Sequence, residues 1–298
     1  MSHSQSLIRD AIQATVNVIS GPAGGVVSVL NQKDAARLSN KFNIRLNDLY
    51  IEAMDQGVWP LCYVRNQSTF SLSDQRFLAK STIAVIGAGG LGGHVISLLA
   101  RMGIGSLIIV DPDAFDETNL NRQPFATMET LGIPKARAVK KHLESINPAV
   151  AVIPHELKLT NSNFNEILTG ADIVVDCLDS ISDRLVLQDA AQKLNIPLVH
   201  GALAGFEGQI MTIYPEDPGL KTIYAAPASL EAGQPSPESI LGVPAITPSM
   251  IGSFQAMEVV KILLKRGRVM RKKMVYLDLD YFSLDEFSFE KTGRENNK

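Results

Sequence analysis

A glycine-rich turn between a short apolar run and an amphipathic segment limits what this chain can fold into more than any other feature. Residues Ile83–Ile86 form a buried-strand candidate, Gly87-Ala88-Gly89-Gly90-Leu91-Gly92 follows directly, and Leu91–Met102 has helical periodicity. Asp111 stands nineteen residues after Gly92, at the end of the next apolar run. In such a strand–turn–helix unit the glycines let backbone amides approach a phosphate, and the acid binds ribose hydroxyls. The pattern predicts a nucleotide-binding unit that fits NAD, FAD or ATP.

Short apolar runs alternate with helical segments between Ser81 and Gly201. This predicts a parallel sheet covered on both faces, because a parallel crossover needs a helix-length connection. After Gly201 the alternation stops, and Gly208–Tyr214 and Met274–Asp280 look like antiparallel strands around a proline-rich loop. The expected fold is α/β, a Rossmann-like doubly wound, mainly parallel sheet with C-terminal antiparallel strands. The other strand candidates are Leu107–Val110, Val150–Ile153, Ile173–Asp176 and Leu198–His200, and the other helix candidates are Lys135–Ile146, Asn163–Leu168, Arg184–Leu194 and Ser249–Leu264.

Residues 1–60 differ in pattern from the rest of the chain. They read as short amphipathic helices broken by Gly21-Pro22-Ala23-Gly24-Gly25, and Asp34–Gly57 has apolar residues at helical spacing. A helix-turn-helix would fit that stretch, but few basic residues line it, which favours a small docking or packing extension. We therefore expect an N-terminal helical extension over residues 1–60 and one larger domain over residues 61–298.

Composition excludes several classes of protein. With 45% hydrophobic and 20% charged residues the chain is typical of soluble globular proteins, and no segment looks like an export signal or a membrane span. A net charge of −3 gives no electrostatic reason to expect nucleic acid as the main partner. The two cysteines, Cys62 and Cys177, exclude a disulfide framework and a tetrathiolate zinc site, and they suit a reducing compartment. We expect a cytoplasmic protein.

Two cations beyond Asp111 favour one class of nucleotide chemistry. Arg122 follows the acid, and Lys135 opens a helix candidate. Hydride transfer has little use for cations converging on phosphates just beyond the ribose acid. Nucleotidyl transfer needs them, because negative charge spreads over the α-phosphate and the leaving pyrophosphate. Either Arg122 or Lys135 by itself would be typical of a solvated surface charge. The two together favour nucleotidyl transfer.

Six stretches between about Tyr63 and about Tyr281 occur in the order and spacing of one known family. On these stretches the chain resembles the adenylyltransferases of the MoeB/ThiF/HesA group, which activate ubiquitin-like proteins. The resemblance implies an ATP-dependent enzyme that adenylates the C-terminal carboxylate of a small ubiquitin-like sulfur carrier ending in Gly-Gly and releases pyrophosphate. Residues 61–298 would then form the adenylation domain. The stretches are Gly87–Gly92, Asp111–Gln123, Gly132–Ala136, Asp176–Ser180, Gly205–Ile210 and Ser253–Lys261.

The resemblance also implies how the nucleotide is held. Gly90 would lie under the phosphates, Asp111 on the ribose, and Lys135 on the phosphates, with Asn119 and Arg122 along the triphosphate. The full expected nucleotide-binding set is Gly87, Gly89, Gly90, Gly92, Asp111, Asp113, Asn119, Arg122, Gln123, Lys135, Asp179 and Ser180.

Magnesium and a second subunit are implied in the same way. Asp179 would hold Mg²⁺, and Arg65, within Tyr63-Val64-Arg65-Asn66-Gln67, would act on the ATP of a neighbouring subunit. The enzyme would then be a homodimer. The expected catalytic residues are Arg65, Arg122, Lys135 and Asp179.

The chain departs from the family pattern at its cysteines. Members with a structural zinc carry two CxxC pairs, and the corresponding segments here, Thr222–Ala225 and Thr292–Glu295, contain no thiol. We therefore expect no zinc. Pro227–Pro248 also lacks the cysteine with which many members form a thioester or persulfide, so another protein would deliver the sulfur. Ser180 stands where the family usually has Asn after the metal-binding Asp.

Cys177 and His200 are expected to be structural. Cys177 lies between Asp176 and Asp179 at the end of an apolar strand, where neighbouring carboxylates would raise its pKa and blunt its nucleophilicity. His200 follows a strand at the carboxyl edge of the expected sheet, where contact with substrate is the alternative to a buried structural role.

Other functions stay open at this point. Asp179-Ser180 resembles family members that act on a tRNA nucleoside, and a short peptide is another possible substrate, whereas Gly205–Ile210 favours a carrier protein. An NAD-dependent oxidoreductase would fit the glycine turn alone. The retained phosphate-contacting positions argue against a non-catalytic scaffold subunit. The sequence identifies neither the carrier nor its pathway.

Overall fold

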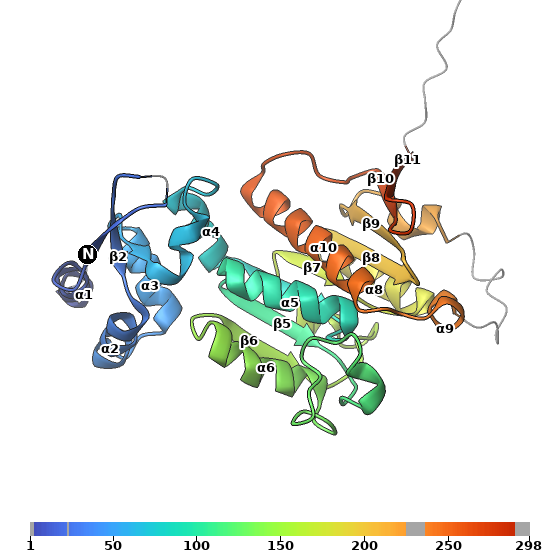
Figure 1. Cartoon of the computed structure of the whole chain (residues 1–298), viewed down its shortest axis with the longest axis horizontal. Coiled ribbons are helices and arrows are strands. Elements are labelled where there is room, and N and C mark those ends of the chain that lie inside the picture. Colours follow the sequence, from blue (N-terminus) through green and yellow to red (C-terminus); the bar gives the residue numbers. More distant parts are fainter. Residues whose placement is uncertain (1–2, 23, 225–235, 290–298) are drawn as a thin grey trace, which may run out of the picture.

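An eight-stranded sheet forms the centre of the molecule, with the strand order β11-β10-β9-β8-β7-β4-β5-β6 (Figure 1). The structure is a computed structural model and describes residues 3–22, 24–224 and 236–289. Strands β6, β5, β4, β7 and β8 pair in parallel, and β8, β9, β10 and β11 pair antiparallel. The strands are Thr82–Ile86 (β4), Ser106–Val110 (β5), Ala151–His155 (β6), Ile173–Asp176 (β7), Leu198–Ala204 (β8), Glu207–Ile213 (β9), Lys273–Asp278 (β10) and Ser283–Ser288 (β11).

The strand order reverses direction beside β4. The chain adds β5 and β6 on one side of β4 and then returns to place β7 and β8 on the other side. In open α/β sheets the crevice at such a reversal, outside the carboxyl ends of the strands, is where ligands bind. The fold therefore points to the ends of β4, β5 and β7 as the place for a site.

Helices cover both faces of the sheet, and β4 shows why. Ile83 and Val85 face the core shared with α5 (Gly90–Met102), α6 (Lys135–Ile146) and α10 (Ile246–Leu264). Ala84 and Ile86 face the opposite core, which contains residues of α7 (Phe164–Leu168) and α8 (Ile181–Lys193). A strand that is buried on both faces has a continuous run of apolar residues rather than an alternating pattern. The prediction of a doubly wound, mainly parallel sheet with C-terminal antiparallel strands is confirmed.

The N-terminal extension contains, besides its expected helices, a small sheet that the sequence reading missed. Strands β1, β2 and β3 form it, β1 antiparallel and β3 parallel to β2. β1 was overlooked because its residues are mostly exposed and show no apolar alternation, while Gly24 and Gly25 turn the chain with positive φ. The elements are α1 (His3–Gln13), β1 (Asn17–Ser20), β2 (Val26–Leu30), α2 (Gln32–Phe42), α3 (Leu46–Met54) and β3 (Trp59–Pro60).

This N-terminal unit has a core of its own, which includes Ile12, Leu30, Leu49 and Tyr50. It continues into the short helix η1 (Leu61–Asn66) and then α4 (Leu72–Lys80), which leads into β4. The buried amide of Asn147, at the end of α6, connects it to the helices on the main sheet by donating to the Tyr63 hydroxyl and to the Ala100 carbonyl of α5, each at 2.7 Å. In Figure 1 the unit lies at the opposite end of the molecule from α9 (Pro237–Leu241). No helix among the described residues is long and apolar enough to span a membrane.

Candidate nucleotide-binding site

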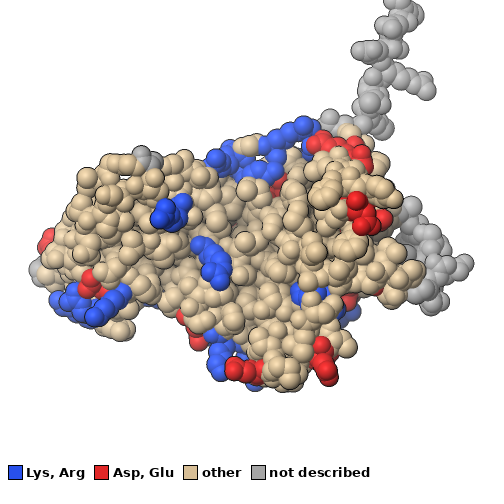
Figure 2. Space-filling model, viewed as in Figure 1, with Lys and Arg blue, Asp and Glu red and all other residues tan. Residues whose placement is uncertain are grey.

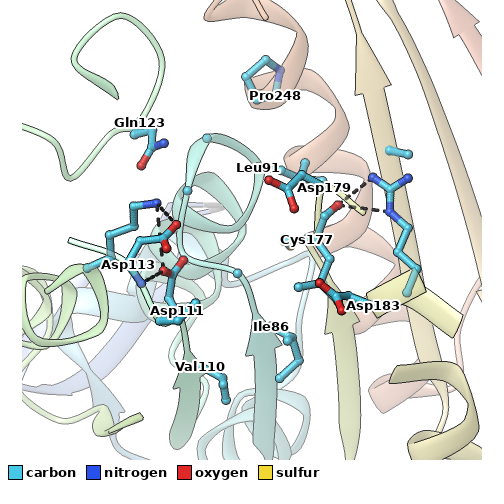
Figure 3. A pocket seen from close by; sticks show the side chains of 18 of the residues that line it. Ile86, Leu91, Val110, Asp111, Asp113, Gln123, Cys177, Asp179, Asp183 and Pro248 are labelled. Atoms are coloured by element: carbon cyan, nitrogen blue, oxygen red, sulfur yellow. Dashed lines mark hydrogen bonds and ion pairs between the residues drawn. The ribbon is translucent and has the colours of Figure 1, made fainter. Parts of the chain in front are cut away.

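A cleft of about 390 Å³ lies at the reversal point, where the carboxyl ends of β4, β5, β7 and β8 meet (Figure 3). On one side are Asp111 and Asp113, which follow β5, and on the other are Asp179 and Asp183, which follow β7. The predicted site residues that line it are Gly87, Gly89, Gly90, Asp111, Asp113, Arg122, Gln123, Lys135 and Asp179.

The glycine turn packs closely on neighbouring backbone at two of its positions. Gly87 has a φ of +97°, and a Cβ there would lie 2.5 Å from the Cys177 carbonyl oxygen. Gly92 does not line the cleft but lets α5 pack closely on the turn, because a Cβ there would lie 1.8 Å from the Gly87 oxygen. The first amides of α5 have no carbonyl partner within the helix and carry the positive end of its dipole. This arrangement binds anions.

Three charged groups meet beside the turn. Lys135, at the first position of α6 and 7% exposed, pairs with Asp113 at 2.9 Å and lies 4.0 Å from Asp111. The Asp111 carboxylate accepts hydrogen bonds from the amides of Ala88, at 2.7 Å, and Asp113, at 2.9 Å. Burial raises the pKa of Asp111, and the Lys135 ammonium opposes that effect. A carboxylate has about four lone-pair sites, so Asp111 keeps capacity for a ribose hydroxyl.

Arg122 and Gln123 close the cleft over the turn. Arg122 Nη1 donates to the Thr118 carbonyl at 2.9 Å and to Asn121 Oδ1 at 2.8 Å. Gln123 is buried, and its Oε1 has no hydrogen-bond partner among the described residues. A buried polar atom without a partner costs about 1–3 kcal/mol. In Figure 3 the Gln123 side chain points into the cleft, where a ligand donor would satisfy it.

Asp179 fits a magnesium ion that also binds phosphate. Its exposed carboxylate lines the cleft and makes no hydrogen bond or ion pair within the part of the chain that the structure describes. No group of three or more His, Cys, Asp or Glu side chains is arranged for a metal among those residues. One carboxylate suffices for Mg²⁺, because this ion usually keeps several waters and takes its other ligands from substrate phosphates.

Besides Gly92, three predicted residues lie outside this cleft. Asn119 is buried in a capping box with Asp116, at the start of the short helix η2 (Glu117–Asn119), so its amide holds the loop together. Ser180 is the N-cap of α8 and accepts from the Asp183 amide at 3.2 Å. Because Asn and Ser are equally good N-caps, Ser180 replaces the usual Asn without loss of that function. Arg65 is exposed on η1 and does not line the cleft of its own chain.

Cys177 and His200 have the structural surroundings expected for them. His200 is fully buried, with its Nδ1 2.7 Å from Asp176 Oδ2, and burial lowers its pKa. The Cys177 thiol lies 3.6 Å from Gln255 Oε1, and burial raises its pKa well above the ordinary value. A thiol with a raised pKa is a poor nucleophile.

The sequence reading missed Arg184 and Glu238, which line the far end of the cleft. Arg184 lies on α8 five residues after Asp179, a spacing that would have indicated it once α8 was known to start at Ile181. Glu238 belongs to α9, within the stretch read as a proline-rich loop, and nothing local links it to the site. Of the segments compared with zinc motifs, Ala225 and Thr292–Glu295 lie outside the described residues.

A run of seven basic residues between Lys261 and Lys273 lies apart from the cleft. Figure 2 shows Lys and Arg side chains gathered over the end of α10, next to acidic ones. Much of this charge is neutralised within the chain, which favours a structural role over docking of an acidic partner. The ion pairs are Lys261–Glu258, Arg268–Glu286, Arg271–Asp217, Arg271–Glu216 and Lys273–Glu286.

Comparison with known proteins agrees with this geometry. The model of the ThiF family matches residues 63–297. This chain belongs to the ThiF family. The match begins at Tyr63, within η1 and just after β3, and it includes every residue of the cleft.

Curated relatives of this ThiF-family chain are named as an activating enzyme or as adenylyltransferases. The SAMP-activating enzyme E1 of Haloferax volcanii is 36% identical over 67% of this chain and 74% of its own length. The sulfur carrier protein adenylyltransferase of Thermus thermophilus is 35% identical over 68% and 77%. The Arabidopsis thaliana adenylyltransferase and sulfurtransferase MOCS3 is 35% identical over 70% of this chain but only 45% of its own length. These relatives confirm the prediction of an adenylyltransferase-type enzyme.

Solved ThiF-like structures share the fold at low sequence identity. Escherichia coli MccB with ATP matches with a TM-score of 0.67 and 19% identity, over 89% of this chain and 81% of that one. MccB with MccA matches with a TM-score of 0.68 and 19% identity, over 88% and 80%. Matches this long must include part of the N-terminal unit, because residues 63–297 make up a smaller share of the chain.

Proposed function

We propose that this protein adenylates the C-terminal carboxylate of a small ubiquitin-like sulfur carrier ending in Gly-Gly, using ATP. One observation carries the proposal: an anion-binding glycine turn, the buried Lys135 and the unpartnered Gln123 oxygen meet in one cleft. Relatives named as sulfur-carrier adenylyltransferase and SAMP-activating enzyme support it.

The reaction requires that the two reactants be positioned and that the negative charge of the phosphates be neutralised. The carrier carboxylate is already ionised at neutral pH, so its attack on the α-phosphate needs no side-chain base. A carboxylate oxygen forms the new bond to phosphorus as the bond to the bridging oxygen breaks, which gives an acyl-adenylate and pyrophosphate. Lys135 and Arg122 are proposed to neutralise the phosphates, and Asp111 is proposed to accept from the ribose.

Magnesium belongs to the proposal as well. Asp179 would hold the ion, assisted by phosphate oxygens and water. When bound, the ion neutralises charge on the phosphates. Asp179 itself keeps its carboxylate directed at the cleft.

We further propose a cytoplasmic homodimer in which Arg65 acts on the neighbouring subunit's ATP. The exposed position of Arg65, away from its own cleft, supports action in trans. Two unbridged cysteines support a reducing compartment. The absence of a cysteine from Pro227–Pro248 supports adenylation alone, with sulfur delivered by another protein.

A short peptide is the second candidate substrate. One observation favours it: the match to MccB extends into the N-terminal unit, whereas the curated sulfur-carrier relatives cover only 67–68% of the chain. MccB has been solved together with MccA. The N-terminal unit is therefore the part of the molecule that would select a peptide.

Two measurements test the proposal. Calorimetry should show ATP binding and no comparable binding of NAD, and the reverse order would favour an oxidoreductase. Incubation with α-labelled ATP should transfer label to a small protein ending in Gly-Gly. Transfer only to a short peptide or only to tRNA would replace the carrier with that substrate, and no transfer to any of them would leave a scaffold role.

A further inference from the structure

The end of the cleft opposite Asp111 contains a buried cation that the nucleotide site does not use. Arg184 is 5% exposed and lies in the first turn of α8, beside the loop that carries Asp179. The cleft lining around it comes from β8 and from the segment that leads into α10. Adenylation brings the nucleotide and the acyl substrate together in one cleft. The glycine turn, Asp111 and Lys135 lie at one end of it, which leaves the other end for the second reactant.

Arg184 has more hydrogen-bonding capacity than its neighbours use. A guanidinium carries five N–H donors. Nε and Nη2 both donate to one acceptor, the Leu178 carbonyl, at 3.1 and 2.6 Å. Nη1 donates to none of the residues that the structure describes. Because Arg184 lines the cleft, this unused donor is available to a ligand there, and its positive charge favours an anionic one.

Among the described residues, one carboxylate pairs with Arg184, and it is held loosely. Glu238 Oε1 lies 3.8 Å from Nη2, which is an ion pair but too long for a hydrogen bond. Glu238 stands on α9, a five-residue helix that is attached to the β8–β9 turn by a hydrogen bond from the Gly205 amide to the Gly242 carbonyl, 2.8 Å long. A substrate carboxylate able to form a forked pair with the guanidinium would bind more tightly than Glu238 does.

We propose that Arg184 recognises the free C-terminal carboxylate of the acyl substrate, and that Glu238 occupies this position until the substrate displaces it. This inference rests on the proposed function, because it concerns the second reactant of the same cleft. Arg184 is thus a specificity-determining residue: it selects substrates that end in a free carboxylate and holds that group at the Asp179 side of the cleft.

The test compares two peptides of eight residues, each ending in Gly-Gly, one with a free carboxylate and one with a C-terminal amide. Affinities are measured by calorimetry in the presence of a non-hydrolysable ATP analogue. The wild-type protein should prefer the acid by about tenfold or more, as expected for a charge-assisted pair. Arg184→Gln should lose that preference and still bind the ATP analogue.

Glu238→Gln is the matched control, because it removes the same ion pair from the other side. It should keep the preference for the acid and bind it equally or more tightly. If Arg184→Gln does not fold, Arg184→Lys is measured in its place. This variant keeps the charge but not the forked geometry of the guanidinium, so it should retain part of the preference for the acid. Equal affinity of the wild-type protein for both peptides, no detectable binding of either, or equal loss in the Arg184 and Glu238 variants would overturn the inference. Substrate-dependent ATP–pyrophosphate exchange by the wild-type protein would then show that adenylation itself stands.

Discussion

Lys135 combines a buried charge with a position at the edge of the glycine turn. Its ammonium is held by Asp113 and approaches Asp111, so the cation is already in position before ATP binds. The neighbouring Gln123 oxygen lacks a partner. A site with a preorganised cation and an unsatisfied polar atom is suited to a ligand that supplies both negative charge and a donor.

Replacement of Lys135 should abolish catalysis without unfolding the chain. Lys135→Ala removes the cation nearest the proposed phosphates, so substrate-dependent ATP–pyrophosphate exchange should fall by about a hundredfold or more. Lys140→Ala is the control, since Lys140 is an exposed lysine on the same helix. Near-normal exchange by Lys135→Ala, measured on protein with an unchanged melting temperature, would contradict the assigned role.

The buried pair of His200 and Asp176 makes stability depend on pH. Burial holds the pKa of His200 below its usual 6.5, so the folded state favours the neutral imidazole and the unfolded state takes up a proton first. The free energy of unfolding should therefore fall as the pH drops below about 6.5. His200→Gln should flatten this slope in denaturant titrations, while replacement of the exposed His142 by Gln should leave it unchanged. An undiminished slope in His200→Gln would contradict the assignment.

At the scale of elements, the turn between β4 and α5 decides whether the cleft exists. Gly87→Ala forces a side chain into positive φ and places its Cβ 2.5 Å from the Cys177 carbonyl oxygen. Gly132 has φ of +78° with nothing within 4 Å of its Cβ position, so Gly132→Ala introduces the backbone strain alone.

Gly87→Ala should therefore cost more stability than Gly132→Ala and should also lose ATP binding. The strain common to both is about 1–3 kcal/mol, and the close contact adds to it only at Gly87. Thermal melting and calorimetric titration with ATP measure the two effects. Equal melting temperatures, with ATP affinity intact in Gly87→Ala, would show that the close approach at Gly87 is unimportant.

Element prediction from the sequence succeeded where burial leaves a pattern and failed where it does not. The strands of the main sheet are buried on both faces, and their apolar runs are visible in the sequence. β1 and β11 are largely exposed and carry no such pattern. The position of Arg184 at the cleft depends on where α8 begins and on β7 lying beside β4, and Asn119 is used in a capping box, so spacing in the sequence alone could assign neither.

For the whole molecule, the proposed dimer predicts complementation between inactive subunits. Arg65→Ala and Lys135→Ala should each be inactive alone. In a heterodimer of the two, one site combines the intact Lys135 of one chain with the intact Arg65 of the other. An equal mixture after subunit exchange should regain about a quarter of wild-type exchange activity, because half the dimers are mixed and each has one complete site. No recovery, with exchange verified by a tag on one variant, would contradict action in trans.

The N-terminal unit and the main sheet are the two parts of the molecule that bear on substrate selection. The unit lies at one end of the molecule and α9 at the other, with the cleft in the main sheet (Figure 1). The end of the cleft proposed for the nucleotide consists of residues that were predicted from the sequence. The end proposed for the acyl substrate is formed by segments that come together only in the folded chain.

ATP–pyrophosphate exchange is the measurement that tests the central claim most directly. Labelled pyrophosphate should enter ATP when the protein is supplied with a small carrier ending in a free Gly-Gly carboxylate, and should not enter when the last two glycines are removed. Exchange that ignores the C-terminus of the carrier, or no exchange with any carboxylate substrate despite ATP binding, would contradict the claim.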